Sequence, residues 1–229
     1  QKVLEEVILK IAKDLKKKTH QTNLCLSGGV ALNCVANGKI KKQGIFENIW
    51  IQPAAGDAGG AVGCALAFWY MHLNKKRQIK NEDSMMGSFL GPRYTKEKIK
   101  KFLKLVGARF DELGTEEMIN NTALAISKGK AIGWFQGNME FGPRSLGSRS
   151  ILADPRNKEM QKNLNLKIKY RESFRPFAPS ILEEDVNSWF DLDCKSPYML
   201  LVDNVKKSKL LKNKTKKSLD INAVRSKIP

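Results

Sequence analysis

Three arginines in a glycine- and serine-rich stretch are the first residues of this sequence that could do chemistry. The stretch reads FGPRSLGSRSILADPR, from Phe141 to Arg156, and its arginines stand five and seven residues apart; five residues separate it from the apolar run AIGWF. A guanidinium group is always charged and binds phosphate through paired hydrogen bonds, so the stretch suits a phosphorylated ligand. The alternative is a plain surface loop, in which the arginines pair with carboxylates such as Glu140 and Asp154.

Two glycine loops form a second candidate site nearer the N-terminus. Ser27-Gly28-Gly29 follows a short apolar run, and GDAGGAVG repeats this arrangement 28 residues later with Asp57 inside it. A glycine turn between a strand and a helix lets backbone N–H groups approach an anion at the positive end of the helix dipole. A carboxylate beside such a turn can ligate a divalent metal or position a hydroxyl. Either loop alone could reflect tight packing, but two in tandem favour ligand binding.

Alternating strands and helices are predicted to position these loops. The first 18 residues form an amphipathic pattern, with apolar residues at helical spacing: Val3, Leu4, Val7, Ile8, Ile11 and Leu15. A strand over 24–26, a helix over 30–42, a strand within IFENIWIQP and an apolar helix after the second glycine loop follow. This order predicts an α/β fold with at least partly parallel strand pairing.

The rest of the chain is also predicted to be α/β. A polar stretch marked by Gly and Pro, residues 74–93, reads as a boundary. Thr95 and Thr115 are the expected N-caps of two helices. Beyond them the pattern predicts a strand over 131–137, a helix over 157–169 and a strand over 196–205.

Composition limits the classes of protein. The chain has 229 residues, 41% of them hydrophobic, and no run of 18 apolar residues that would predict a membrane span. Four cysteines without a C-x-x-C pair and only two histidines argue against a zinc site. We expect buried free thiols and a cytoplasmic location.

The net charge of +18 raises nucleic acid as a partner. Its distribution weakens that interpretation, because the Lys-rich stretch at 206–217 lacks interleaved aromatic residues and resembles a solvated loop. We therefore do not expect nucleic acid as the main partner. A basic RNA-binding module remains the alternative function; the family resemblance described next implies that such a module would be related to tRNA threonylcarbamoylation proteins.

Four long motifs together resemble the O-carbamoyltransferase family of the nodulation-factor and antibiotic-tailoring type. They occur in the order LSGGVALN, GDAGGAVGCAL, GWFQGNMEFGPRSLGSRSILADPR and IKYRESFRPFAPSIL, and the resemblance extends from about Asn23 to Pro229. It implies that residues 1–80 are the C-terminal half of an actin-like ATPase (ASKHA) domain. It also implies that residues 81–229 are part of a YrdC-like α/β domain.

The resemblance implies a division of labour between these modules. The YrdC-like module would use ATP and carbamoyl phosphate to make carbamoyl adenylate, and the ASKHA module would move the carbamoyl group to a hydroxyl of a small-molecule or glycan acceptor. By position in the motifs, the phosphates of the activation site would contact Arg144, Lys169 and Arg175. Further candidates there are Arg149, Ser150 and Arg171.

In the ASKHA module the resemblance assigns the glycine loops. The nucleotide-contacting loop would include Gly28, Gly29 and Asn33, and Asp57 would be a carboxylate ligand of a divalent metal, Fe²⁺ or Mg²⁺. The sequence departs from the family pattern because His20 and His72 are single, so the family's His-x-x-x-His metal pair is absent. We therefore expect a piece of a larger enzyme without a complete transferase site, whose partner is the missing half or a second copy of the chain.

Overall fold

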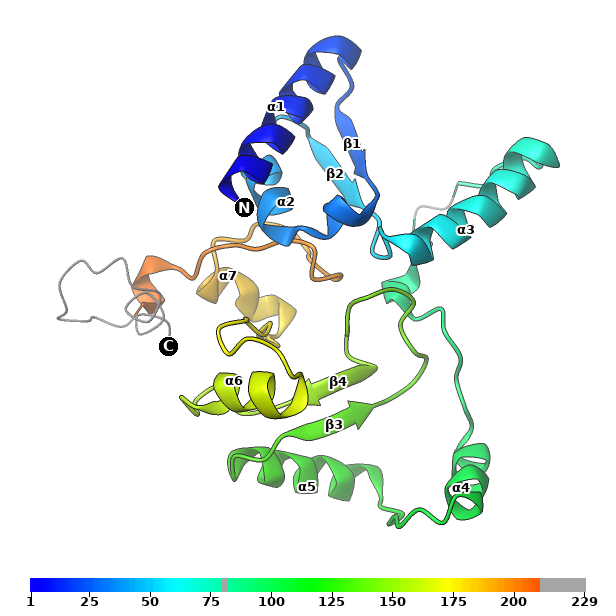
Figure 1. The fold of residues 1–229 in the computed structure, drawn as a ribbon, viewed down its shortest axis with the longest axis vertical. Coiled ribbons are helices and arrows are strands. Elements are labelled where there is room, and N and C mark those ends of the chain that lie inside the picture. The colour runs from blue at the N-terminus through cyan, green and yellow to red at the C-terminus, as the bar shows by residue number, and fades with distance from the viewer. Residues whose placement is uncertain (80–81, 211–229) are drawn as a thin grey trace. The chain divides into compact units, whose positions relative to one another are not determined.

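The computed structural model describes residues 1–79 and 82–210, and the chain forms two compact units. The first unit comprises Gln1–Ala61 together with the chain from Pro179 onward, and the second comprises Val62–Ala178. Helices and short strands occur together (Figure 1), which confirms the predicted α/β class. The polypeptide therefore leaves the first unit and later returns to it. The predicted family modules, which meet near residue 80, stay a prediction.

The first unit is built on two parallel strands. β1 (Asn23–Leu26) pairs with β2 (Asn48–Ile51), and Leu24 lies opposite Ile49. A parallel pair needs a crossover connection, and α2 (Cys34–Lys42) supplies it. The core between the strands, α2 and α1 (Lys2–Thr19) is apolar and contains Ala12, Leu24, Ile40 and Phe46.

The apolar face of α1 is wider than the core that it covers. Ile8 and Leu9 pack against the core, whereas Val3, Val7 and Ile11 are 74%, 47% and 61% exposed. The predicted helix is thus present, but only part of its apolar stripe is buried. The physical reason is that a sheet of two strands is too narrow to cover the whole stripe.

The predicted helix over 30–42 is interrupted at Asn33. A 3₁₀ turn (Gly29–Leu32) comes first, and α2 then begins at Cys34 with Asn33 as its N-cap, whose Oδ1 accepts the N–H of Ala36 at 3.1 Å. Asparagine competes with helical hydrogen bonding and favours caps, which explains the break.

The segment at 196–205, predicted as a strand, is not one. Among the residues that the structure describes, its β-type pairing is limited to one isolated antiparallel bridge, between Phe190 and Val205. The segment packs on α2 instead, where the buried Asn37 donates to the carbonyl of Leu200 at 3.0 Å. Gly38 admits the backbone carbonyl of Val202, because a Cβ atom built on Gly38 would lie 2.5 Å from that oxygen.

The second unit contains an antiparallel pair. β3 (Ile132–Phe135) pairs with β4 (Arg149–Leu152), and Phe135 lies opposite Arg149. β4 lies within the stretch 141–156 that the sequence presents as a loop, so that prediction was wrong for residues 149–152. α5 contacts β3.

Helices make up most of the remaining regular structure. Thr95 caps α4 as predicted, accepting the N–H of Lys98 at 3.4 Å, whereas the N-cap before α5 is Gly114 rather than Thr115. α3 and α6 each continue into a π-helical turn, Phe68–His72 and Leu164–Ile168. The bounds of these helices are Asp57–Ala67 (α3), Lys96–Leu105 (α4), Thr115–Ser127 (α5), Met160–Asn163 (α6) and Val186–Trp189 (α7).

The four cysteines are free thiols, but none is buried, contrary to expectation. Cys25 and Cys64 are exposed, and Cys34 and Cys194 are half-buried. The expectation was wrong because the strand and helix that carry Cys25 and Cys64 each leave that side chain uncovered.

Within residues 1–79 and 82–210, no helix is both long and apolar enough to cross a membrane.

The close approach at Gly38 gives a test of the packing between α2 and the returning segment. Gly38→Ala should lower the free energy of unfolding by about 1–3 kcal/mol, because the new methyl group collides with the carbonyl of Val202. Gly63→Ala in α3 is the matched control, since a Cβ there meets nothing within 4 Å; relief of glycine entropy should stabilise that variant by roughly 0.5–1 kcal/mol. Urea unfolding measures both, and equal effects would contradict the observed packing.

Candidate functional site

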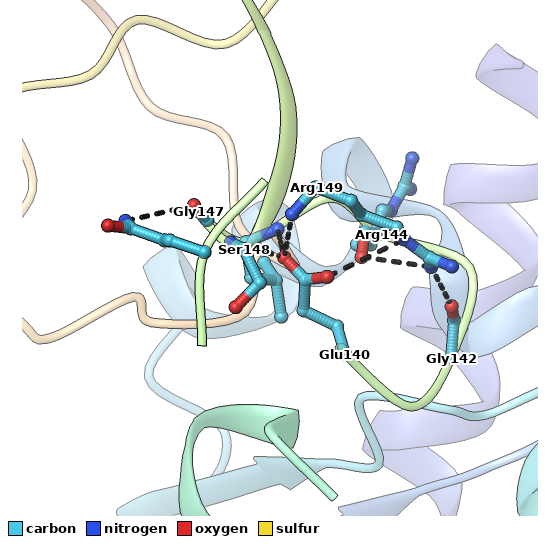
Figure 2. Close-up of polar contacts among 8 residues, drawn as sticks. Glu140, Gly142, Arg144, Gly147, Ser148 and Arg149 are labelled. Carbon is cyan, nitrogen blue, oxygen red and sulfur yellow. Dashed lines mark hydrogen bonds and ion pairs between the residues drawn. The ribbon is translucent and has the colours of Figure 1, made fainter. Parts of the chain in front are cut away.

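The arginine-bearing loop is folded around one buried carboxylate, that of Glu140. Its Oε1 accepts three backbone N–H groups, from Leu146 at 2.8 Å, Ser148 at 2.8 Å and Arg149 at 3.2 Å. Its side chain is fully buried, and Oε2 lies 3.6 Å from Nε of Arg149 (Figure 2). The carboxylate therefore replaces the backbone partners that a regular strand or helix would supply to these N–H groups.

The environment of Glu140 keeps it ionised. Burial alone would raise the pKa of this carboxyl group, but the backbone N–H groups that it accepts outweigh burial, and its pKa is lowered from the ordinary value of 4.5. Hydrogen bonds to the charged form have this effect because protonation would weaken all of them at once.

Arg149 closes the loop from the other side. Its Nη2 donates to the carbonyl of Gly142 at 2.5 Å and lies 3.5 Å from the carbonyl of Arg144 (Figure 2). The structure thus brings Arg144 and Arg149 together within one loop, and Arg149 pairs with Glu140 as the surface-loop alternative proposes. The side chain of Arg149 still keeps about a third of its surface exposed.

The last arginine of the stretch also pairs with a carboxylate. Arg156 binds Asp154 through both its Nε and Nη2, with the shortest contact at 2.7 Å, and this pairing lowers the pKa of Asp154 to about 2. Ser150 lies in β4 opposite Trp134 and is half-buried. Arg156 therefore has a structural partner, and Arg144 is half-buried in the middle of the loop.

A second loop is organised by Asn165, which is fully buried. Its Nδ2 donates to the carbonyls of Ser173 at 3.1 Å and Arg175 at 2.8 Å, and its Oδ1 accepts Nε of Arg171 at 2.6 Å. Arg171 also stacks over the ring of Phe177, 4.9 Å from the centroid. One carboxamide thus fixes both the course of the loop and the orientation of Arg171.

Lys169, Arg171 and Arg175 are brought onto this loop. Lys169 and Arg175 are exposed, and Nε of Arg175 lies 2.9 Å from Glu172. Tyr170, between them, is 86% exposed with a left-handed backbone (φ 47°). The loop therefore presents two cations and one aromatic ring to solvent. The residue that organises it, Asn165, was missed in the sequence, where it reads as one polar position of a helix.

The first unit holds the other predicted site residues. Both predicted glycine loops follow the carboxyl ends of neighbouring parallel strands, but the second was only partly a loop, because α3 begins at Asp57 and takes up the rest of GDAGGAVG. The backbone N–H of Gln52 donates to the carbonyl of Leu26 at 3.0 Å, so the two connections start side by side. Ligands of α/β sheets bind at this edge. Gly28 has a φ of +91°, and a Cβ at Gly28 or Gly29 would meet nothing within 4 Å, so the surface over the loop is open.

Asn33 and Asp57 lie in different settings. The carboxamide of Asn33 caps α2 and exchanges hydrogen bonds with Gln1 at 3.0 and 3.2 Å. Asp57 is exposed at the start of α3. In the part of the chain that the structure describes, no three His, Cys, Asp or Glu side chains gather as a metal site would require. These residues alone do not fit a resident metal, and Asp57 remains a predicted single ligand.

Comparison with known protein families gives two matches. Residues 1–66 match a model described as carbamoyltransferase N-terminus, and residues 123–227 match one described as carbamoyltransferase C-terminus. Both glycine loops fall in the first match, and all of the predicted phosphate-binding residues fall in the second.

Curated relatives agree with these matches. An uncharacterized protein of Synechocystis is 54% identical over 90% of this chain and 34% of its own length. Nodulation protein NolO of Bradyrhizobium diazoefficiens is 39% identical over 91% of this chain and 38% of its own length. A 3'-hydroxymethylcephem-O-carbamoyltransferase of Streptomyces clavuligerus is 30% identical over 81% and 33%. The chain thus spans about a third of the length of these relatives.

Glu140 offers a test of how the arginine loop is held. Glu140→Gln should lower the free energy of unfolding at pH 7 by about 1–3 kcal/mol. In one orientation the neutral amide turns its NH₂ group toward the three backbone N–H donors, and in the other its oxygen accepts them more weakly than a carboxylate does. The pKa of Glu140 is lowered in the folded protein, so its contribution is present above pH 4.5 and is lost as the pH falls through the folded pKa. The difference between the two proteins should therefore shrink in acid.

Glu159→Gln is the matched control for this prediction. Glu159 is exposed and 3.9 Å from Lys162, so its loss should change stability by less than about 0.5 kcal/mol. Urea unfolding of the wild type and of both variants, at pH 7 and at pH 4, gives the four differences in stability from wild type. A Glu140→Gln variant as stable as the control at pH 7 would show that the carboxylate does not hold the loop.

Proposed function

Because this chain belongs to the carbamoyltransferase family, we propose that the protein carrying it transfers a carbamoyl group to a hydroxyl of a small-molecule or glycan acceptor. We propose further that the reaction uses ATP and carbamoyl phosphate and proceeds through carbamoyl adenylate. The observation that carries the proposal is the match of both family models, in order, to one chain. A relative named for O-carbamoyl transfer to a hydroxymethylcephem supports a hydroxyl acceptor.

The cationic loops of the second unit suit the activation step. Forming the adenylate first requires water to release phosphate from carbamoyl phosphate; a carbamate oxygen then attacks the α-phosphorus of ATP, the bond between the α- and β-phosphates breaks, and negative charge stays on the departing pyrophosphate. Fixed cations stabilise that charge, and they do so best when they are already oriented before reaction. Arg144, Lys169 and Arg175 are the proposed cations, because loops built around the buried side chains of Glu140 and Asn165 hold their backbones in place.

The glycine loops of the first unit suit the transfer step. In this proposal Gly28, Gly29 and Asn33 contact the nucleotide at the sheet edge, and the acceptor hydroxyl attacks the carbamoyl carbon while AMP leaves. The ASKHA assignment of the first module and the YrdC-like assignment of the second are part of the proposal. A metal bound in part by Asp57 remains an expectation, and no step is assigned to it.

RNA binding is the weaker alternative. It rests on the net charge of +18 and on the Lys-rich stretch at 206–217, of which residues 211–217 lie outside the described part of the chain. Arg144, Arg171 and Arg175 lie in small loops, where they suit compact phosphates rather than an extended backbone.

The activation step can be tested by exchange of pyrophosphate into ATP, dependent on carbamoyl phosphate, in the full-length protein. Arg144→Ala and Lys169→Ala should each slow exchange by roughly ten- to a hundredfold, since a hydrogen bond to a charged group contributes about 1.5–3 kcal/mol. Arg109→Ala and Lys128→Ala, at exposed positions elsewhere in the second unit, are matched controls. Normal exchange in both test variants would remove these residues from the activation site.

A further inference from the structure

The segment that returns to the first unit is tied to the first glycine loop by a single buried side chain. Asn37 is 3% exposed, and its Nδ2 donates to two carbonyls, that of Ala31 at 2.8 Å and that of Leu200 at 3.0 Å. A carboxamide nitrogen has two hydrogens, so these two bonds use both of them. Ala31 belongs to the 3₁₀ turn that starts at Gly29, and Leu200 lies 163 residues after Asn37 in the chain.

Further contacts hold this returning segment, defined here as residues 198–203, against α2. Tyr198 and Leu200 are buried, and the carbonyl of Val202 lies over Gly38. Asp203 forms an ion pair with Lys42 at the end of the helix. The segment therefore has fixed positions at its start, middle and end, and Asn37 stands at the middle one.

The turn that Asn37 holds is the one that carries the open glycines. Within it, the N–H of Ala31 donates to Gly28 and the N–H of Asn33 donates to Val30, each at 3.0 Å. A 3₁₀ turn has poorer hydrogen-bond geometry than an α-helix, so an external partner for the carbonyl of Ala31 matters for its shape. If the returning segment leaves, one hydrogen of a buried amide loses its partner and the favourable position of Asn37 is lost.

We infer that Asn37 is a positioning residue, through which docking of residues 198–203 on α2 sets the conformation of the Gly28–Asn33 loop. Asn37 and the loop fall in the region matched by the N-terminal family model, whereas the returning segment falls in the region matched by the C-terminal one. The C-terminal region thereby controls a loop of the N-terminal region. The consequence for carbamoyl transfer rests on the proposed function, in which this loop contacts the nucleotide during the transfer step.

The first measurement is amide hydrogen exchange over residues 29–33 of the full-length protein. Asn37→Asp keeps the size of the side chain but removes both donated hydrogen bonds, and should speed exchange there by about tenfold. Asn48→Asp is the matched control, since Asn48 is an exposed amide of β2 whose Nδ2 bonds only to Asn23 among described residues. Equal exchange over 29–33 in Asn37→Asp and wild type would overturn the inference.

A second variant perturbs the segment without touching the loop. Gly38→Ala displaces the carbonyl of Val202 and should also speed amide hydrogen exchange over residues 29–33. The added methyl group cannot form a hydrogen bond, so its effect on those residues would come through the returning segment. This variant carries the test if Asn37→Asp does not fold. Faster exchange at residues 198–203 with unchanged exchange at 29–33 would overturn the coupling.

Two rate measurements then separate the positioning role from the proposed function. Both variants should slow transfer of the carbamoyl group to the acceptor by about tenfold, while carbamoyl phosphate-dependent exchange of pyrophosphate into ATP stays near the wild-type rate, a split that general loss of folded protein would not produce. Faster amide hydrogen exchange at 29–33 with an unchanged transfer rate would support the positioning role and remove the glycine loop from the nucleotide site.

Discussion

The carboxylate of Glu140 is the interaction on which the arginine-bearing loop depends. One oxygen receives three backbone N–H groups and the other faces Arg149, so a chain that turns sharply between β3 and β4 has its polar groups satisfied from inside. The negative charge at the centre also makes it favourable to hold the guanidinium of Arg149 beside it. Without that charge, arginines close enough to bind one anionic ligand would repel one another when the ligand is absent. Glu140 thus contributes both the shape and the electrostatic balance of this loop.

Asn165 solves the same problem in the second loop with a neutral group. A carboxamide both donates and accepts, so it can satisfy two carbonyls and one guanidinium at the same time. Because it adds no negative charge, the positive potential of Lys169 and its neighbours stays uncompensated by the organising residue. The two loops therefore differ in electrostatics: one is balanced around a buried anion, and the other presents a net cationic surface.

Much of the fold could be predicted from the sequence, because its elements have local causes. The helical stripe of α1, the glycine turns after β1 and β2, and the threonine cap of α4 each follow from a few adjacent residues. What could not be predicted depends on contacts across the chain. The segment at 196–205 has a strand-like composition, yet its backbone packs on α2 instead of on a strand. Asn37 donates to the carbonyl of Leu200, and Gly38 leaves room for the carbonyl of Val202. Glu140 and Asn165 look like ordinary polar residues in the sequence, and only their burial shows that each organises a loop whose arginines the motifs had already singled out.

The close fit between Gly38 and Val202 also bears on how members of this family can exchange parts of their genes. A hybrid protein that took its N-terminal region from one relative and its C-terminal region from another would have to join a helix and a segment shaped for different partners. A relative with any side chain in place of Gly38 would need a returning segment that runs further from the helix, and with it a different companion for Asn37. The two regions are thus constrained to change together at this contact, even though more than 150 residues of chain separate them.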